Sequence, residues 1–132
     1  MAKDFPDDII ISADTVVVLD GRILGKPHSR EEAFSMLSSL SGRSHTVYTG
    51  VCVISKDIKA CFAEATDVTF AELCDEEINA YMETGEPFDK AGAYGIQGKG
   101  SIMITSINGD YYNVMGLPVS KLYKVLKDNS II

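Results

Sequence analysis

Residues 9–27 read IIISADTVVVLDGRILGKP, with β-branched runs on both sides of a central Ser-Ala-Asp-Thr. This composition is typical of a strand that is buried on both faces of a sheet. The Asp-Gly pair at 20–21 predicts a tight turn into a short return segment that ends at Lys26 and Pro27. Such a hairpin would bring Lys26 back towards Asp14.

Asp14 stands in the middle of this apolar strand. A buried carboxylate loses its hydration, which costs several kcal/mol unless a cation or hydrogen-bond donors compensate. One interpretation is an aspartate that closes a strand or caps a turn. The other, which we favour, is a functional carboxylate at the mouth of a cleft.

Composition limits the classes of protein to consider. The chain has 132 residues, of which 45% are hydrophobic, which suits a single compact domain over residues 1–132 with a sizeable core. A net charge of −7 argues against binding to a nucleic acid polymer, and no apolar run is long enough to span a membrane. Cys52, Cys61 and Cys74 are odd in number and lack metal-site spacing, so we expect reduced cysteines in a cytosolic protein.

The rest of the chain mixes helical and strand patterns. Ser29 and Glu32 form a capping box in front of apolar residues at helical spacing. The elements predicted after the first hairpin are a helix from Ser29 to Gly42, strands at 45–55 and 60–73, a helix at 76–84, a strand at 101–107, a connection at 113–116 and a helix that begins at Pro118. This mixture indicates an α/β (α+β) fold with a mixed sheet.

His45 opens the strand predicted at 45–55. A catalytic histidine would need a nucleophile nearby, and none is evident in the surrounding sequence. We therefore interpret His45 as a strand-start residue that is hydrogen-bonded locally.

Residues 86–100, EPFDKAGAYGIQGKG, are rich in glycine and contain Lys90 and Lys99. Glycines allow backbone N–H groups to converge on an anion, and lysine adds a positive charge suited to phosphate. The pattern is neither a Walker A loop nor a dinucleotide fingerprint. A plain glycine-rich connection and a phosphate cradle both remain open.

Five segments carry a resemblance to a known family. They are ADTVV at 13–17, GKP at 25–27, LSGRSHTVYTG at 40–50, GEPFDKAGAYGIQG at 85–98 and NVMGLP at 113–118. In this order and spacing they resemble the Maf family of nucleoside triphosphate pyrophosphatases, over nearly the whole chain.

The resemblance implies hydrolysis of a nucleoside triphosphate to a monophosphate and pyrophosphate with a divalent metal, Mg or Mn. It implies a cytoplasmic, often dimeric enzyme with an elongated, twisted mixed sheet flanked by helices, of the Maf/ITPase type. The family's proton acceptor corresponds to Asp14, which we also expect to bind the metal, and its GKP lysine corresponds to Lys26. The base-selectivity positions correspond to Thr15 and Gln97, in a combination that resembles the subgroup acting on dTTP and UTP. Lys90, with Lys26, would stabilise phosphate charge.

The family also has an N-terminal strand and an SxSPRR loop, and this sequence contains neither. We therefore expect hydrolysis to be impaired. The alternative is a non-catalytic remnant that acts as a weak nucleotide-binding or dimerisation module. A sheet that lacks one strand presents an unpaired edge, so we also expect a homodimer or other self-association.

Overall fold

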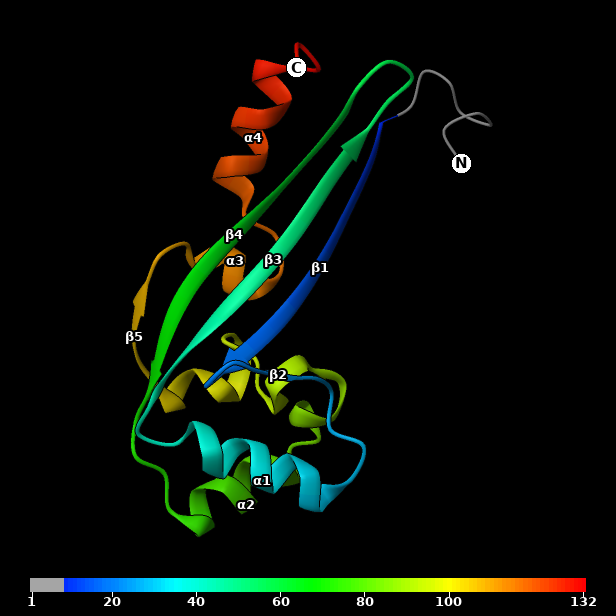
Figure 1. Cartoon of the computed structure of the whole chain (residues 1–132). Coiled ribbons are helices and arrows are strands. Elements are labelled where there is room, and N and C mark those ends of the chain that lie inside the picture. The colour runs from blue at the N-terminus through cyan, green and yellow to red at the C-terminus, as the bar shows by residue number, and fades with distance from the viewer. Residues whose placement is uncertain (1–8) are drawn as a thin grey trace.

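A computed structural model describes residues 9–132 and contains a five-stranded sheet. The strands are β1 (Ile10–Leu19), β2 (Arg22–Leu24), β3 (Ser44–Ile54), β4 (Lys59–Phe70) and β5 (Ile104–Asn108). They lie in the order β2-β1-β3-β4-β5, and β1, β3 and β4 are much longer than β2 and β5, with α4 beside their upper part (Figure 1).

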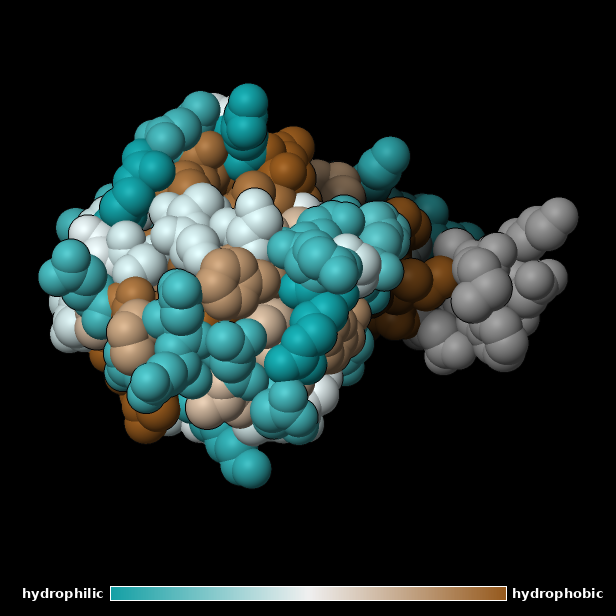
Figure 2. All heavy atoms as spheres, turned by 90° about the horizontal axis from the view of Figure 1, so that it is seen from below, coloured by the Kyte–Doolittle hydropathy of each residue, from teal (hydrophilic) through white to brown (hydrophobic). Residues whose placement is uncertain are grey.

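Helices lie at one end of the sheet and along one of its sides (Figure 1). They are α1 (Arg30–Leu40), α2 (Asp75–Glu83), α3 (Tyr111–Met115) and α4 (Val119–Asp128), with 3-10 segments η1 (Glu86–Asp89), η2 (Ala91–Ala93) and η3 (Gly98–Met103). No helix in this part of the chain is long and apolar enough to cross a membrane. Viewed from the end that carries α1 and α2, the surface is mostly hydrophilic or neutral, with scattered apolar patches (Figure 2).

The predicted α/β class and the elongated sheet with flanking helices are confirmed. All four pairings among the described strands are antiparallel, so the sheet is more uniform than the mixed one we expected. The single domain over residues 1–132 stays a prediction, because residues 1–8 lie outside the described part.

Only one face of the sheet is covered. Side chains alternate between the two faces of a strand, and along β3 every second residue is buried: His45, Val47, Thr49, Val51 and Val53. The residues between them are exposed or half-buried. The helices therefore pack on one face, and the other face is open among the described residues.

This asymmetry corrects our expectation for β1. Only Val17 and Leu19 of the strand are buried, whereas Ile11 and Asp14 are exposed. A β-branched run predicts a strand but does not show whether a second layer covers each face. The prediction of a strand buried on both faces, with a desolvated Asp14, is therefore wrong.

The core has two parts. The larger part joins the sheet to α1 and α2 and includes Leu37, Val47 and Phe70. The smaller part lies under α4, where Leu122 packs against Val51 and Val53. The predicted first helix is confirmed, since the Ser29 hydroxyl accepts a hydrogen bond from the backbone N–H of Glu32 at 3.1 Å.

Two predicted elements differ from the structure. The strand predicted at 101–107 begins only at Ile104, because η3 occupies the preceding residues. The connection predicted at 113–116 is largely the short helix α3, and the Asp110 side chain caps it by accepting from the Tyr112 N–H at 2.8 Å. A helix of five residues is too short to show a helical period in sequence.

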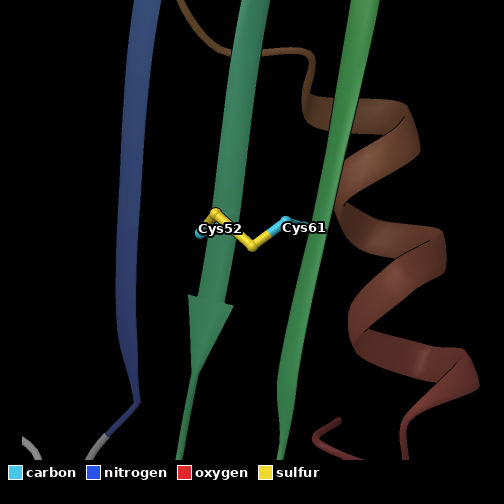
Figure 3. The surroundings of a disulfide bond; sticks show 2 residues. All are labelled: Cys52 and Cys61. Carbon is cyan, nitrogen blue, oxygen red and sulfur yellow. A yellow bond between two sulfur atoms is a disulfide. The ribbon is translucent and has the colours of Figure 1, made fainter.

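Two cysteines that we expected to be reduced form a disulfide. Cys52 on β3 and Cys61 on β4 are register partners, with their Cα atoms 4.1 Å apart (Figure 3). Sequence spacing alone did not reveal this register. Cys74 is free and exposed.

His45 is bonded across the core rather than locally, which corrects our interpretation. Its Nε2 lies 2.6 Å from the hydroxyl oxygen of Tyr94, 49 residues further along the chain. The His45 ring also makes an edge contact with Phe70. Burial lowers the pKa of His45 from 6.5 to about 4, and the charge of Asp67 acts in the opposite direction.

The depressed pKa predicts an acid-sensitive core. The unfolded chain binds a proton at His45 below pH 6.5, whereas the folded chain does so only near pH 4, so stability is lost as the pH falls between these values. We expect His45 to contribute roughly 3 kcal/mol to this loss, measured by urea unfolding at several pH values. His45→Gln should flatten the profile over this interval. His28→Gln is the control, because His28 is exposed; equal slopes for both variants would contradict the assignment.

Candidate functional site

A cavity of about 420 Å³ gathers residues from separate motifs. Four of the predicted site residues line it: Thr15, Lys26, Lys90 and Gln97. Thr15 comes from β1, Lys26 follows β2, and Lys90 and Gln97 come from the glycine-rich segment. Residues 114–116, at the end of α3, supply a further wall.

The glycine-rich segment is attached to the β1–β2 hairpin through Gly92. The Gly92 N–H donates to the Gly25 carbonyl at 3.1 Å. Gly92 has a φ of 74°, and a Cβ there would lie 3.0 Å from the Val17 side chain. This close approach needs glycine, and it places Lys26 and Lys90 on the same cavity.

The two lysines bring positive charge to the cavity in a chain of net charge −7. The Lys90 ammonium donates to Asp89 Oδ1 at 3.1 Å and lowers the pKa of that carboxyl, with a smaller contribution from Lys26. Both side chains of this ion pair are open to solvent.

Glu86 organises the loop that carries Gln97. Its carboxylate accepts from the backbone N–H groups of Lys99 at 3.2 Å and Gly100 at 3.4 Å. It also accepts from the Tyr81 hydroxyl at 3.0 Å, and the same hydroxyl oxygen accepts from the Gly95 N–H at 3.0 Å. The backbone donors at 99–100 are therefore directed at an internal carboxylate, which favours an ordered connection over a phosphate cradle at these two residues.

Thr15 is part of a hydrogen-bonded chain that leads into the core. Its hydroxyl oxygen lies 2.9 Å from that of Thr49, which donates to the Asn113 carbonyl at 3.2 Å. The buried Asn113 amide nitrogen donates to the Val47 carbonyl at 3.1 Å and the Thr66 hydroxyl at 2.9 Å. These bonds fix the end of α3, and with it one wall of the cavity, against the sheet.

Asp14 does not line the cavity. It is exposed and pairs with Gly50 across β3, on the opposite face of the strand from Thr15. β2 pairs only with residues 17–19 of β1. In the described part of the chain, residues 10–16 of β1 therefore form a free sheet edge. Asp14 and Thr15 are thus neighbours on opposite sides of one exposed sheet edge.

The described residues contain no group of three or more His, Cys, Asp or Glu side chains that could hold a metal. The cavity lining includes lysines but no carboxylate. A Mg²⁺ ion is often held by one or two carboxylates together with substrate phosphates. The residues here fit a metal ion only if substrate phosphates supply further ligands, with Asp14 as the one predicted protein ligand.

Several site residues were missed from the sequence. Tyr94 lines the cavity and is buried, and burial raises the pKa of its hydroxyl. Glu86, Thr49 and Asn113 support the cavity walls through long-range contacts. Thr49 carried a usable signal, since it is a polar residue at a core-facing position of an alternating strand.

A second cavity of about 460 Å³ is lined in part by Tyr81. It is lined mainly by apolar and small residues, among them Leu73, Ile102 and Met103. None of the predicted site residues reaches it. The first cavity is therefore the candidate site.

Comparison with known proteins matches the family described as Maf-like protein over residues 1–129. The chain belongs to this family. A Maf-like relative from Bacillus anthracis, named dTTP/UTP pyrophosphatase, is 54% identical over 131 residues, covering 99% of this chain and 69% of the relative. Relatives with the same name from Bacillus cereus strain AH820 and Bacillus thuringiensis subsp. konkukian are also 54% identical, with the same coverage.

In this Maf-like chain, Glu86→Ala should loosen the loop around Gln97. Three donors lose their acceptor, so we expect faster amide hydrogen exchange at Lys99 and Gly100 and a loss of about 1–3 kcal/mol in unfolding free energy. Glu83→Ala is the control, because it removes only an exposed ion pair to Arg30, a change within about 1 kcal/mol. Exchange rates at residues 99–100 equal to those of the parent would refute the role of Glu86.

Proposed function

We propose that this chain binds a pyrimidine nucleoside triphosphate, dTTP or UTP, in the first cavity and hydrolyses it to the monophosphate and pyrophosphate. The observation that carries the proposal is that Thr15, Lys26, Lys90 and Gln97 line one cavity although they come from separate motifs. The relatives named dTTP/UTP pyrophosphatase support the choice of base and reaction.

The cavity supplies different chemistry for the two ends of the substrate. Gln97 offers one acceptor and two donors, and Thr15 a hydroxyl, for the polar edge of the base. Lys26 and Lys90 offer positive charge to the phosphates. Phosphoryl transfer depends mainly on positioning and neutralisation of charge, so this division suits the reaction.

Asp14 would act at the sheet edge. A triphosphate that leaves the cavity across the free edge of β1 passes from the Thr15 side to the Asp14 side. There the Asp14 carboxylate accepts a proton from a water molecule as the water oxygen bonds to the α-phosphorus. The bond from this phosphorus to the bridging oxygen breaks, and pyrophosphate leaves. A bound Mg²⁺ or Mn²⁺ would supply further charge neutralisation, held by Asp14 and the phosphates.

A second candidate is a non-catalytic module of the same family that binds nucleotide weakly or mediates dimerisation. The position of Asp14 outside the cavity favours it. A pyrophosphate-release assay over UTP, dTTP, CTP and GTP separates the two functions. We further propose a cytoplasmic location and a homodimer, which fractionation and light scattering test.

Asp14→Asn keeps the shape of the side chain and removes its basicity. If Asp14 is the proton acceptor, we expect kcat to fall by about 10²–10⁴ while the affinity for UMP stays within about threefold. Asp57→Asn, in the exposed turn between β3 and β4, is the control. Turnover by Asp14→Asn at the parent rate would assign Asp14 a structural role.

Gln97→Met replaces the amide by an apolar group of similar size. We expect the preference of kcat/KM for UTP and dTTP over CTP and GTP to flatten by roughly tenfold or more, because the polar pairing with the base is lost. Lys124→Met, on the exposed surface of α4, is the control. An unchanged ranking of the four nucleotides would remove Gln97 from the base pocket.

A further inference from the structure

We propose that Thr49, which does not line the cavity, determines base specificity by fixing the direction of the Thr15 hydroxyl. Held in this way, Thr15 acts as a hydrogen-bond acceptor for the N3–H group of uracil or thymine. The inference rests on the proposed function and assigns an additional specificity-determining residue to the same site.

Three oxygen atoms, those of the Thr15 and Thr49 hydroxyls and the Asn113 carbonyl, lie within hydrogen-bond distance in succession. The hydroxyl oxygens of Thr15 and Thr49 are 2.9 Å apart, and the Thr49 oxygen is 3.2 Å from the Asn113 carbonyl oxygen. Thr49 is fully buried, whereas Thr15 is half-buried and reaches the cavity.

The direction of these bonds follows from counting hydrogens. A carbonyl oxygen only accepts, and a hydroxyl has one hydrogen. In the pattern that we propose, Thr49 donates its hydrogen to the Asn113 carbonyl and meets Thr15 as an acceptor. Thr15 then donates its single hydrogen to Thr49, which leaves only lone pairs for a ligand.

An acceptor at this position discriminates among pyrimidines. On the pairing edge of uracil or thymine the only donor is N3–H, since O2 and O4 accept. Cytosine has an unprotonated acceptor nitrogen at position 3, which would face the Thr15 lone pairs without a hydrogen. The Gln97 amide, with its two donor hydrogens, can then bond a carbonyl of the uracil ring.

The end of this chain is held rigidly. Asn113 lies in α3, and its side-chain amide donates to acceptors on β3 and β4. Its carbonyl also accepts from the Gly116 N–H at 3.0 Å. Removing the Thr49 hydroxyl therefore leaves this carbonyl with a partner, so Thr49→Val is a mild change that frees the Thr15 hydrogen.

Calorimetry would measure the binding of three ligands: UMP, CMP and N3-methyl-UMP. Each ligand is titrated into the unmodified protein and into the variants Thr49→Val, Thr49→Ser and Thr46→Val. Monophosphates report on the base pocket without turnover. Thr46→Val removes a hydroxyl from the opposite face of the same strand, where it bonds Asp67, and is the matched control.

We expect the unmodified protein to prefer UMP over CMP, and over N3-methyl-UMP, by at least about tenfold. Thr49→Val should narrow the UMP-to-CMP ratio by about fivefold or more, mainly by a gain in CMP affinity, because Thr15 can then donate to N3 of cytosine. Thr49→Ser should restore the parent ratio, and Thr46→Val should leave it unchanged.

Each contrary result has a distinct meaning. Equal binding of UMP and CMP by the unmodified protein would overturn the proposed base pocket and this inference with it. A uracil preference that persists unchanged in Thr49→Val, even with weaker binding overall, would overturn the role of Thr49 alone. Tight binding of N3-methyl-UMP would show that Thr15 does not accept from N3–H.

Discussion

The hydrogen bonds of Asn113 are the constraint on which the cavity depends. A polar side chain in the core needs partners, and the Asn113 amide nitrogen donates to the Val47 carbonyl and the Thr66 hydroxyl, whereas its side-chain oxygen has no partner among the described residues. These bonds fix a helix of only five residues that could not be stable alone. Residues 114–116 at its end form a wall of the cavity, and the Asn113 carbonyl accepts a hydrogen bond from the Thr49 hydroxyl, which contacts the Thr15 hydroxyl.

The other walls are held by similar contacts between distant segments. Gly92 approaches the hairpin closely enough to bond Gly25, which brings the two lysines of the cavity together. Glu86 fixes the following loop through backbone N–H groups, so that Gln97 reaches the cavity from an ordered segment. Lys26 and Lys90 are thus positioned by different contacts from those that hold the loop of Gln97, and variants should separate the proposed phosphate binding from the proposed base recognition.

The sequence predicted the secondary structure well wherever a period was long enough to detect. The capped helix after Ser29 and the hairpin of β3 and β4 are examples. It also named four residues that line the cavity, Thr15, Lys26, Lys90 and Gln97, because the family motifs contain them, but it did not single out Tyr94. What it could not predict depends on tertiary contacts: the exposure of Asp14, the register that joins Cys52 to Cys61, and the role of Glu86. None of these leaves a periodic signal in one sequence.

We propose that the cavity between Thr15 and Gln97 is the nucleotide site. The most direct test is a titration of ¹⁵N-labelled protein with UMP, followed by the amide chemical shifts. We expect saturable shifts at residues 15, 97 and 114–116, with little change beside Ile102 in the second cavity. Shifts confined to the surroundings of Ile102, or none at Thr15 and Gln97 at saturation, would contradict it.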